Sequence, residues 1–194
     1  MTDQHPPIPE RPLLRGERTW LRPLEERDMP AYVAGINDAE VGGMAGYPMP
    51  HSVAQATAWL HKVMEGWGRD GLFFAVCELG DDRFVGTTWL KELNLWNGNA
   101  ELAIFMDRDH IGGGWGTDAQ RALLEFAFRS LGLERVYLTT AADDNARAIR
   151  SYEKVGFRVE GRMRRAYRGF QGLHDALLMS ILRDEWEALG GNRG

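Results

Sequence analysis

The sequence predicts a mixed α/β protein, in which a largely antiparallel sheet carries helices on its faces. Two observations support this fold class. Residues 72–106 contain three apolar runs joined by turn-rich links, a pattern typical of a strand meander. Beyond residue 112, helical and strand patterns alternate, which favours a sheet that includes parallel strands.

The length of 194 residues suits one domain with its own apolar core. We expect that domain to span residues 14–189. Residues 1–13 hold four prolines among polar residues and predict a flexible lead-in, and residues 190–194 predict a short tail. The apolar stretches are far shorter than the roughly 20 residues of a membrane-spanning helix, and the N-terminus lacks a signal-peptide pattern. We therefore expect a cytoplasmic protein with no membrane partner.

Charge and side-chain spacing argue against two further classes of protein. The formal net charge of −5 disfavours a nucleic-acid partner, because phosphate binding requires a basic surface. The histidines show no metal-ligand spacing, so we expect no metal. The single cysteine, Cys77, lies within an apolar run and is interpreted as a small core residue.

The first half of the chain predicts a strand, two helices and the meander. Residues 19–24 are typical of an edge strand, because their proline lacks the N–H that an inner strand donates. Asp28 is expected to cap a helix, and Ser52 with Gln55 forms a capping-box pattern before a second helix. The meander strands are expected at residues 72–79, 83–91 and 99–106.

The second half predicts two helices and three further strands. The helix that begins near residue 117 has an apolar face and ends at Gly132, which can adopt the left-handed conformation of a C-terminal cap. A shorter helix is expected at about 144–154, with Asp144 or Asn145 as its cap. The remaining strands are expected at residues 136–140, 157–165 and 173–182.

A glycine-rich loop between a strand and a helix is the most informative segment. Residues 112–116 read Gly-Gly-Gly-Trp-Gly, and such a loop lets backbone N–H groups converge at a helix N-terminus, which favours an anion. No Gly-Lys-Ser/Thr follows, so the loop is not a P-loop, and Thr117 occupies the third glycine position of a dinucleotide-binding motif. A plain flexible link is the alternative interpretation.

This loop resembles the signature of the GNAT superfamily of N-acyltransferases, Gln/Arg-x-x-Gly-x-Gly/Ala. Gly114-Trp115-Gly116 matches its glycines, much as in the branch of ribosomal-protein N-terminal acetyltransferases, whereas Ile111 departs from the usual Gln or Arg. The resemblance implies a GNAT-type fold with a splayed parallel strand pair at its centre, and acetyl-CoA as co-substrate. It implies that the CoA diphosphate is bound by Ile111, Gly112, Gly113, Gly114, Trp115, Gly116 and Thr117.

Residues 145–157 resemble a second family motif, Asn-x-x-Ala-x-x-x-Tyr-x-x-x-Gly-Phe, with all five fixed positions present. From the residues alone, Tyr152 is either a core aromatic on an apolar helix face or a functional group. The resemblance implies that Tyr152 protonates the departing thiolate and that Asn145 binds the pantetheine arm. A phenol with an ordinary pKa near 10 is protonated at neutral pH, so it can act as an acid.

Glu101 begins a strand that is otherwise made of small and apolar residues, where an unpaired carboxylate is costly. It either bonds a neighbouring strand or an arginine or, as in several members of the family, serves as the general base for the acceptor amine. The resemblance also implies that Ile104, Phe105 and Met106 bind pantetheine through main-chain groups, like an added strand.

The resulting expectation is an acetyl-CoA-dependent enzyme that acetylates a primary amine. A protein N-terminus, a polyamine, an aminoglycoside and an amino acid all fit, because the acceptor loops vary within the family. A non-catalytic acyl-CoA sensor and an interaction module that uses exposed Trp96 and Trp115 are the alternatives. Dimers are common in the family, so the resemblance allows a homodimer. The arginine run Arg162, Arg164, Arg165 and Arg168 is typical of a solvated strand face, with an acidic partner or a coenzyme phosphate as the alternatives.

Overall fold

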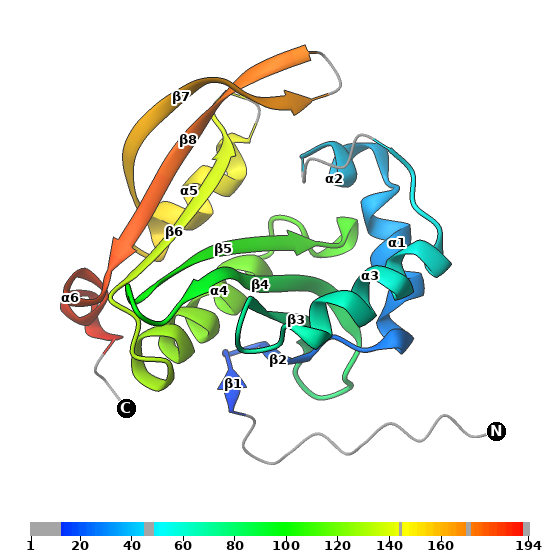
Figure 1. Cartoon of the computed structure of the whole chain (residues 1–194), viewed down its shortest axis with the longest axis horizontal. Coiled ribbons are helices and arrows are strands. Elements are labelled where there is room, and N and C mark those ends of the chain that lie inside the picture. The colour runs from blue at the N-terminus through cyan, green and yellow to red at the C-terminus, as the bar shows by residue number, and fades with distance from the viewer. Residues whose placement is uncertain (1–12, 45–48, 144, 170–171, 192–194) are drawn as a thin grey trace.

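The computed structural model describes residues 13–44, 49–143, 145–169 and 172–191, and all of its named strands belong to one sheet (Figure 1). In chain order the strands are β1 (Leu14–Arg15), β2 (Thr19–Pro23), β3 (Gly71–Glu78), β4 (Phe84–Asn94), β5 (Asn99–Met106), β6 (Arg135–Ala141), β7 (Arg158–Gly169) and β8 (Gly172–Leu182). They lie side by side in the order β1-β2-β3-β4-β5-β6-β8-β7. Every expected strand is present, and the predicted mixed α/β class is confirmed.

The sheet is antiparallel except at its centre, where β5 and β6 run parallel. These two strands pair only where they begin, with Asn99 opposite Arg135 and Glu101 opposite Tyr137. Beyond this point β5 continues along β4 as far as Met106, whereas β6 continues along β8. The sheet therefore divides into two half-sheets that diverge from a short common seam, and the predicted splayed strand pair is confirmed.

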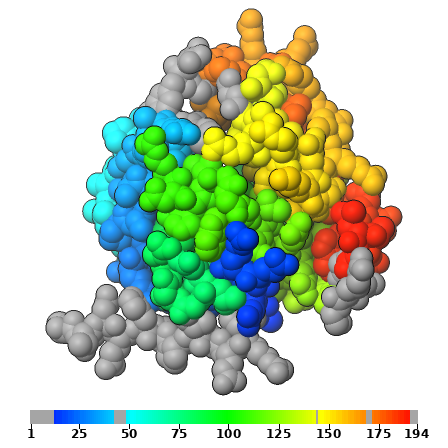
Figure 2. All heavy atoms as spheres, turned by 180° about the vertical axis from the view of Figure 1, so that it is seen from behind, coloured from blue at the N-terminus to red at the C-terminus, as the bar shows by residue number. Residues whose placement is uncertain are grey.

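Helices cover both faces of this sheet. They are η1 (Glu26–Asp28), α1 (Met29–Ile36), α2 (Ala39–Met44), α3 (Val53–Glu65), η2 (Arg108–His110), α4 (Trp115–Glu125), η3 (Phe126–Ser130), α5 (Ala146–Lys154), α6 (Arg183–Trp186) and η4 (Glu187–Gly191). Helices α1 and α3 pack on one face, and α4 and α5 lie behind the strands in the orientation of Figure 1. Seen from behind in Figure 2, α4 (green) and α5 (yellow) are neighbours on the surface. In the part of the chain that the structure describes, no helix has the length and apolar character needed to cross a membrane.

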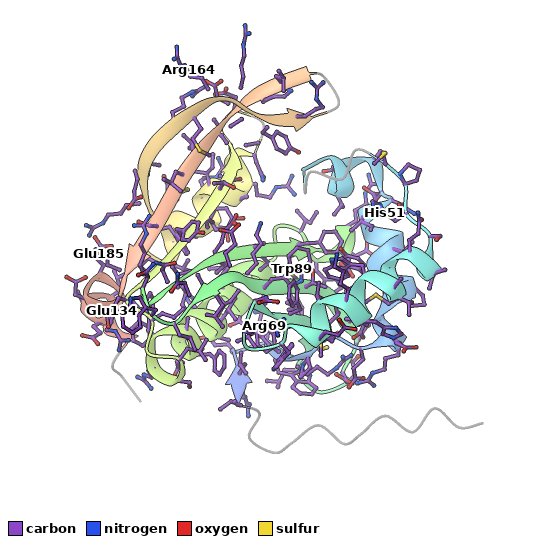
Figure 3. The ribbon with its side chains drawn as sticks, in the orientation of Figure 1. His51, Arg69, Trp89, Glu134, Arg164 and Glu185 are labelled. Atoms are coloured by element: carbon purple, nitrogen blue, oxygen red, sulfur yellow. The ribbon has the colours of Figure 1, made fainter. Side chains whose placement is uncertain are left out.

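Two apolar clusters hold the helices to the sheet. On one face, Phe105 of β5 packs with residues of α1 and α3, and on the other face Leu102 of β5 packs with residues of α4. Five rings on the first face contact one another at centroid distances of 5.6–6.1 Å: Tyr32, Trp59, Phe73, Trp89 and Phe105. Figure 3 shows Trp89 on this face of the sheet. Because strand side chains alternate, β5 sends its odd-numbered residues toward α1 and α3 and its even-numbered residues toward α4.

Two local expectations need correction. Strand β2 does not form the edge of the sheet, because β1 pairs with its outer side, with Leu14 opposite Leu21. Asp28 does not cap α1, because its carboxylate is held by Arg22 Nη1 and Nη2 at 2.8 and 2.7 Å and by the Glu25 N–H at 2.8 Å. Helices α2 and α6 were not predicted.

Other local expectations are confirmed. Ser52 Oγ accepts a hydrogen bond from the Gln55 N–H at 3.2 Å at the start of α3. Gly132 follows η3 with a φ of +69°, and Cys77 is fully buried. The expected cap of α5 is not confirmed: the Asn145 side chain makes no capping hydrogen bond, and Asp144 lies outside the described residues.

Candidate active site

The glycine-rich loop lies between η2 and α4, just beyond the end of β5. Gly112 and Gly114 have φ values of +92° and +86°, a left-handed conformation that glycine adopts without strain. Open space lies beside both, since a Cβ added to either would meet no atom within 4 Å. Gly114 is the N-cap of α4, so the partial positive charge of a helix N-terminus adjoins this space. The loop can therefore admit an anion close to its backbone.

Asp118, in the first turn of α4, anchors the loop to the start of the chain. Its buried carboxylate accepts hydrogen bonds from the N–H groups of Glu17, Arg18 and Thr19 at 2.8, 3.1 and 2.9 Å, and from Thr19 Oγ1 at 2.7 Å. Arg18 Nη1 also donates to the Gly113 carbonyl at 2.8 Å. Figure 2 shows the start of the described chain (blue) against the green surface that includes α4. Residues about 100 positions away in sequence thus fix the loop, a link that sequence reasoning missed.

A first cavity, of about 470 Å³, adjoins the glycine loop, β5 and α5. Most residues that the sequence assigned to coenzyme binding line it: Ile104, Phe105, Met106, Ile111, Gly112, Gly114, Gly116, Thr117, Asn145 and Tyr152. Gly113 and Trp115 do not. The Trp115 ring is half-buried between the His110 ring, at 5.1 Å, and the Arg18 guanidinium, at 5.9 Å. The expectation of an exposed Trp115 is therefore wrong, whereas Trp96 is 96% exposed.

Three basic side chains of α5 line the same cavity, and sequence reasoning did not single them out. They are Arg147, Arg150 and Lys154, and their spacing of three and four residues places them on one helix face. All three are exposed, and none forms an ion pair with a described carboxylate. They add positive potential to the cavity beside the glycine loop. The sequence does show the spacing of these three residues. However, a helix face that lines a cavity and a helix face that lies in solvent have the same spacing.

Tyr152 projects from α5 and lines this cavity. Its side chain is almost wholly buried, and burial raises its pKa to about 12, because a phenolate is poorly solvated there. The phenol is therefore protonated at neutral pH. The preceding residue, Ser151, links α5 to α4: its hydroxyl bonds the Thr117 hydroxyl at 2.8 Å and accepts from Gln120 Nε2 at 3.3 Å.

A second cavity, of about 350 Å³, is lined by residues from β4, β5, β6 and the β7–β8 hairpin. Glu101 lines it with a side chain that is 12% exposed. Glu101 Oε1 lies 3.2 Å from Lys91 Nζ and accepts a hydrogen bond from Thr139 Oγ1 at 3.5 Å. The carboxylate is thus bound to its neighbouring strands, as one interpretation of the sequence held, and it also reaches a cavity, as a general base requires.

The two cavities share four lining residues: Ile104, Phe105, Asn145 and Tyr152. They lie where β5 and β6 diverge. Asn145 Nδ2 donates to Thr140 Oγ1 at 3.3 Å, which joins the start of α5 to β6 at this point. The cavity that contains the glycine loop and the protonated phenol therefore adjoins, where the strands diverge, a cavity that holds a carboxylate.

The arginines of the β7–β8 hairpin line neither cavity. Arg164 projects away from the body of the protein in Figure 3. Arg162 is bound by Asp143 and Asp175, at 2.6 and 2.7 Å. These positions favour the solvated-face interpretation. Among the described residues, no group of three or more His, Cys, Asp or Glu side chains is placed to hold a metal ion.

Comparison with known sequences identifies the family of the chain. Residues 18–158 match the family model of an acetyltransferase (GNAT) domain. The p20 protein of Bacillus licheniformis, named as an uncharacterized N-acetyltransferase, is 25% identical over 177 residues, which cover 89% of this chain and 97% of the relative. The spermidine N(1)-acetyltransferase of Escherichia coli (strain K12) is 29% identical over 168 residues, which cover 87% of this chain and 88% of the relative.

Solved structures show the same architecture. The spermidine N-acetyltransferase from Vibrio cholerae, in complex with CoA and spermine, superposes with a TM-score of 0.79 at 24% identity, covering 87% of this chain and 98% of that one. Mycobacterium smegmatis RimJ, in complex with CoA-disulfide, gives a TM-score of 0.76 at 23% identity, covering 86% and 83%. At these identities the likeness establishes a shared fold.

Proposed function

Since this chain belongs to the acetyltransferase (GNAT) family, and is therefore an acetyl-CoA-dependent N-acetyltransferase, we propose that it acetylates a primary amine bound in the second cavity. We name the first cavity the coenzyme cavity and the second the acceptor cavity. The observation that carries the proposal is their contact at four shared residues in the splay of the sheet. Donor and acceptor can approach each other there from opposite faces of β5.

The residues of the coenzyme cavity fit acetyl-CoA. Gly112 and Gly114 leave the approach to the loop open, and the cavity wall includes three cations of α5 that form no ion pair with a described carboxylate. In this proposal the loop N–H groups of residues 111–117 and those cations bind the phosphates. The main chain of residues 104–106 receives the pantetheine arm as an added strand. Bound acetyl-CoA supplies an acetyl group activated as a thioester.

The acid and the base then lie on opposite sides of the reacting groups. Glu101, in the acceptor cavity, takes a proton from the incoming amine, directly or through water. Tyr152 lines both cavities and donates its proton toward the departing sulfur, and its raised pKa of about 12 keeps the donor form populated. A backbone N–H near Phe105 or Met106 polarises the acetyl carbonyl.

We further propose that this activity belongs to a single domain of residues 14–189, flanked by short tails. Every residue that lines either cavity lies between Val41 and Ala176. One sheet joins the strands that contribute them. Residues 1–12 and 192–194 lie outside the described residues, and η4 extends to Gly191.

The proposal is tested by thiol release from acetyl-CoA across a panel of amines. In Tyr152→Phe, we expect kcat to fall by about 100-fold, a usual share for general acid catalysis, while the calorimetric Kd for CoA stays within about twofold. Tyr137→Phe is the matched control, because Tyr137 lies on β6 and lines neither cavity. An unchanged kcat in Tyr152→Phe would remove Tyr152 from the mechanism. Absence of thiol release with every amine would refute amine acetylation.

A further inference from the structure

The described lining of the acceptor cavity holds one cation and one carboxylate. Among its described lining residues, Lys91 carries the one basic side chain and Glu101 the one carboxyl group. Lys91 lies opposite Glu101 in the β4–β5 ladder, and Lys91 Nζ is 3.2 Å from Glu101 Oε1. Both side chains emerge on the face of the sheet that carries α1 and α3. This wall is therefore neutral overall but strongly dipolar.

Two described carboxylates next to the lining are paired with one arginine, whereas Glu92, which follows Lys91, accepts a hydrogen bond from the Tyr137 hydroxyl at 2.7 Å. Asp175 precedes the lining residue Ala176, and its carboxylate contacts Arg162 Nε at 2.7 Å. Asp143 contacts Nη2 of the same guanidinium at 2.6 Å. A polyamine carries several positive charges and binds well where several carboxylates are free to meet them. The described residues that line this cavity instead include a single carboxylate, one oxygen of which lies 3.2 Å from Lys91 Nζ.

The rest of the lining combines three polar side chains, Thr139, Thr140 and Asn145, with an apolar and aromatic wall that includes Trp89, Phe105, Tyr152, Met163 and Tyr167. Trp89 Nε1 is buried and has no hydrogen-bond partner among the described residues, so an N–H donor beside the cavity is unsatisfied. The volume of about 350 Å³ lies at the small end of ligand pockets. These properties suit a small ligand with an apolar side chain and an oxygen that accepts hydrogen bonds.

On the premise of the function proposed above, we propose that the acceptor is a small zwitterionic amine, namely an α-amino acid with an apolar side chain. The amino group of this ligand would contact Glu101, and its carboxylate would contact Lys91. The charge dipole of the ligand would then run opposite to that of the Lys91–Glu101 pair. The side chain of the ligand would lie against the aromatic wall. A polyamine, by contrast, would bring a second positive charge toward Lys91, and the described lining of the cavity holds no second carboxylate to balance it.

The reaction balances without any further reactant. Glu101 takes one proton from the ammonium group, the free amine attacks the acetyl carbon, and an N–C bond forms as the C–S bond breaks. Tyr152 gives a proton to the leaving sulfur. The amine loses two protons in total, of which one ends on the CoA thiol and one goes to solvent. The products are an N-acetyl amino acid and CoA.

Thiol release measures this selectivity directly. L-leucine and L-leucinamide share their side chain and α-amine but differ in the carboxylate, and spermidine and a leucine-led tetrapeptide represent the other acceptor classes. We expect kcat/KM for leucine to exceed that for leucinamide by about tenfold or more, because one charge-assisted contact contributes about this factor. In Lys91→Met this preference should fall below about threefold, since the contact is lost. Lys62→Met, on the exposed surface of α3, is the matched control and should keep the preference.

The outcomes separate this inference from the proposed function. A higher kcat/KM for spermidine or for the tetrapeptide than for leucine overturns the inference and leaves amine acetylation intact. Equal use of leucine and leucinamide by the unaltered protein overturns it as well, and that comparison needs no variant to fold. Turnover of no amine in the panel refutes the function on which the inference rests.

Discussion

Replacing Asp118 with alanine should destabilise the fold strongly, because one buried carboxylate joins the start of the chain to the N-terminus of α4. Asp118 is 6% exposed and accepts four hydrogen bonds from Glu17, Arg18 and Thr19. Thr19 is fully buried and provides two of these bonds, one from its N–H and one from its hydroxyl. Alanine would leave both donors without an acceptor and out of reach of bulk water.

The magnitude follows from those two donors. A buried donor that loses its acceptor costs about 1–3 kcal/mol, so Thr19 alone accounts for about 2–6 kcal/mol. The N–H groups of Glu17 and Arg18 are half-buried and can regain water, so they add little. We therefore expect Asp118→Ala to lower the free energy of unfolding by about 3–5 kcal/mol, a large share of the roughly 5–15 kcal/mol that stabilises a domain.

Urea denaturation followed by tryptophan fluorescence and circular dichroism measures this loss. Glu125→Ala is the matched control, because Glu125 lies on the same helix, is exposed, and pairs with Arg129 at 3.0 Å. That exposed pair should be worth no more than about 0.5 kcal/mol. If the two variants differed by less than about 1 kcal/mol, the anchoring role of Asp118 would be refuted.

Two further predictions concern charged groups. The double variant Arg147→Ala/Arg150→Ala should weaken calorimetric CoA binding by about tenfold or more at low salt, since charge-assisted phosphate contacts are lost, and the deficit should shrink near 0.5 M salt. An unchanged Kd would show that these arginines do not bind phosphate. Hydrogen bonds from Arg135 and Ser180 lower the pKa of Glu160 from 4.5 to about 2, so its contribution to stability is present above about pH 4.5 and is lost as the pH falls toward 2. Glu160→Gln should remove this part of the acid dependence in unfolding experiments, and an acid slope equal to that of the unaltered protein would contradict the assignment.

The sequence predicted those elements whose ends are set by neighbouring residues. The Ser52–Gln55 capping box and the left-handed Gly132 are local signals, and both are present in the structure. Helix α2 has two glycines among its six residues, so it lacks the local preference that would reveal it. Strand β1 has two residues and exists through its pairing with β2, which is a contact between separate segments. The proline that predicted an edge, Pro23, lies beyond the residues of β2 that pair with β1.

The candidate site was also only partly predictable from the sequence. The segments around Gly114 and Tyr152 are contiguous motifs, so they could be recognised, and both line the coenzyme cavity. Lys91 could not be matched with Glu101, because the β4–β5 register shifts after Lys91 and Glu92 has a φ of +51°. A slip of one residue would carry Lys91 to the other face of the sheet. The composition of the acceptor cavity therefore depends on an irregularity that residue patterns do not reveal.

The division of the sheet explains how a single side chain reaches both cavities. Strand β6 is bound to β8 along its whole length, from Arg135 to Ala141, and β5 is bound to β4 as far as Met106. Each strand therefore belongs to a different half-sheet, and the opening between them admits Tyr152 from α5. The same placement buries the phenol and raises its pKa, so the geometry that opens a route between the cavities also keeps the acid protonated. If β5 and β6 stayed paired to their ends, Tyr152 would face one cavity alone and could not serve a transfer between them.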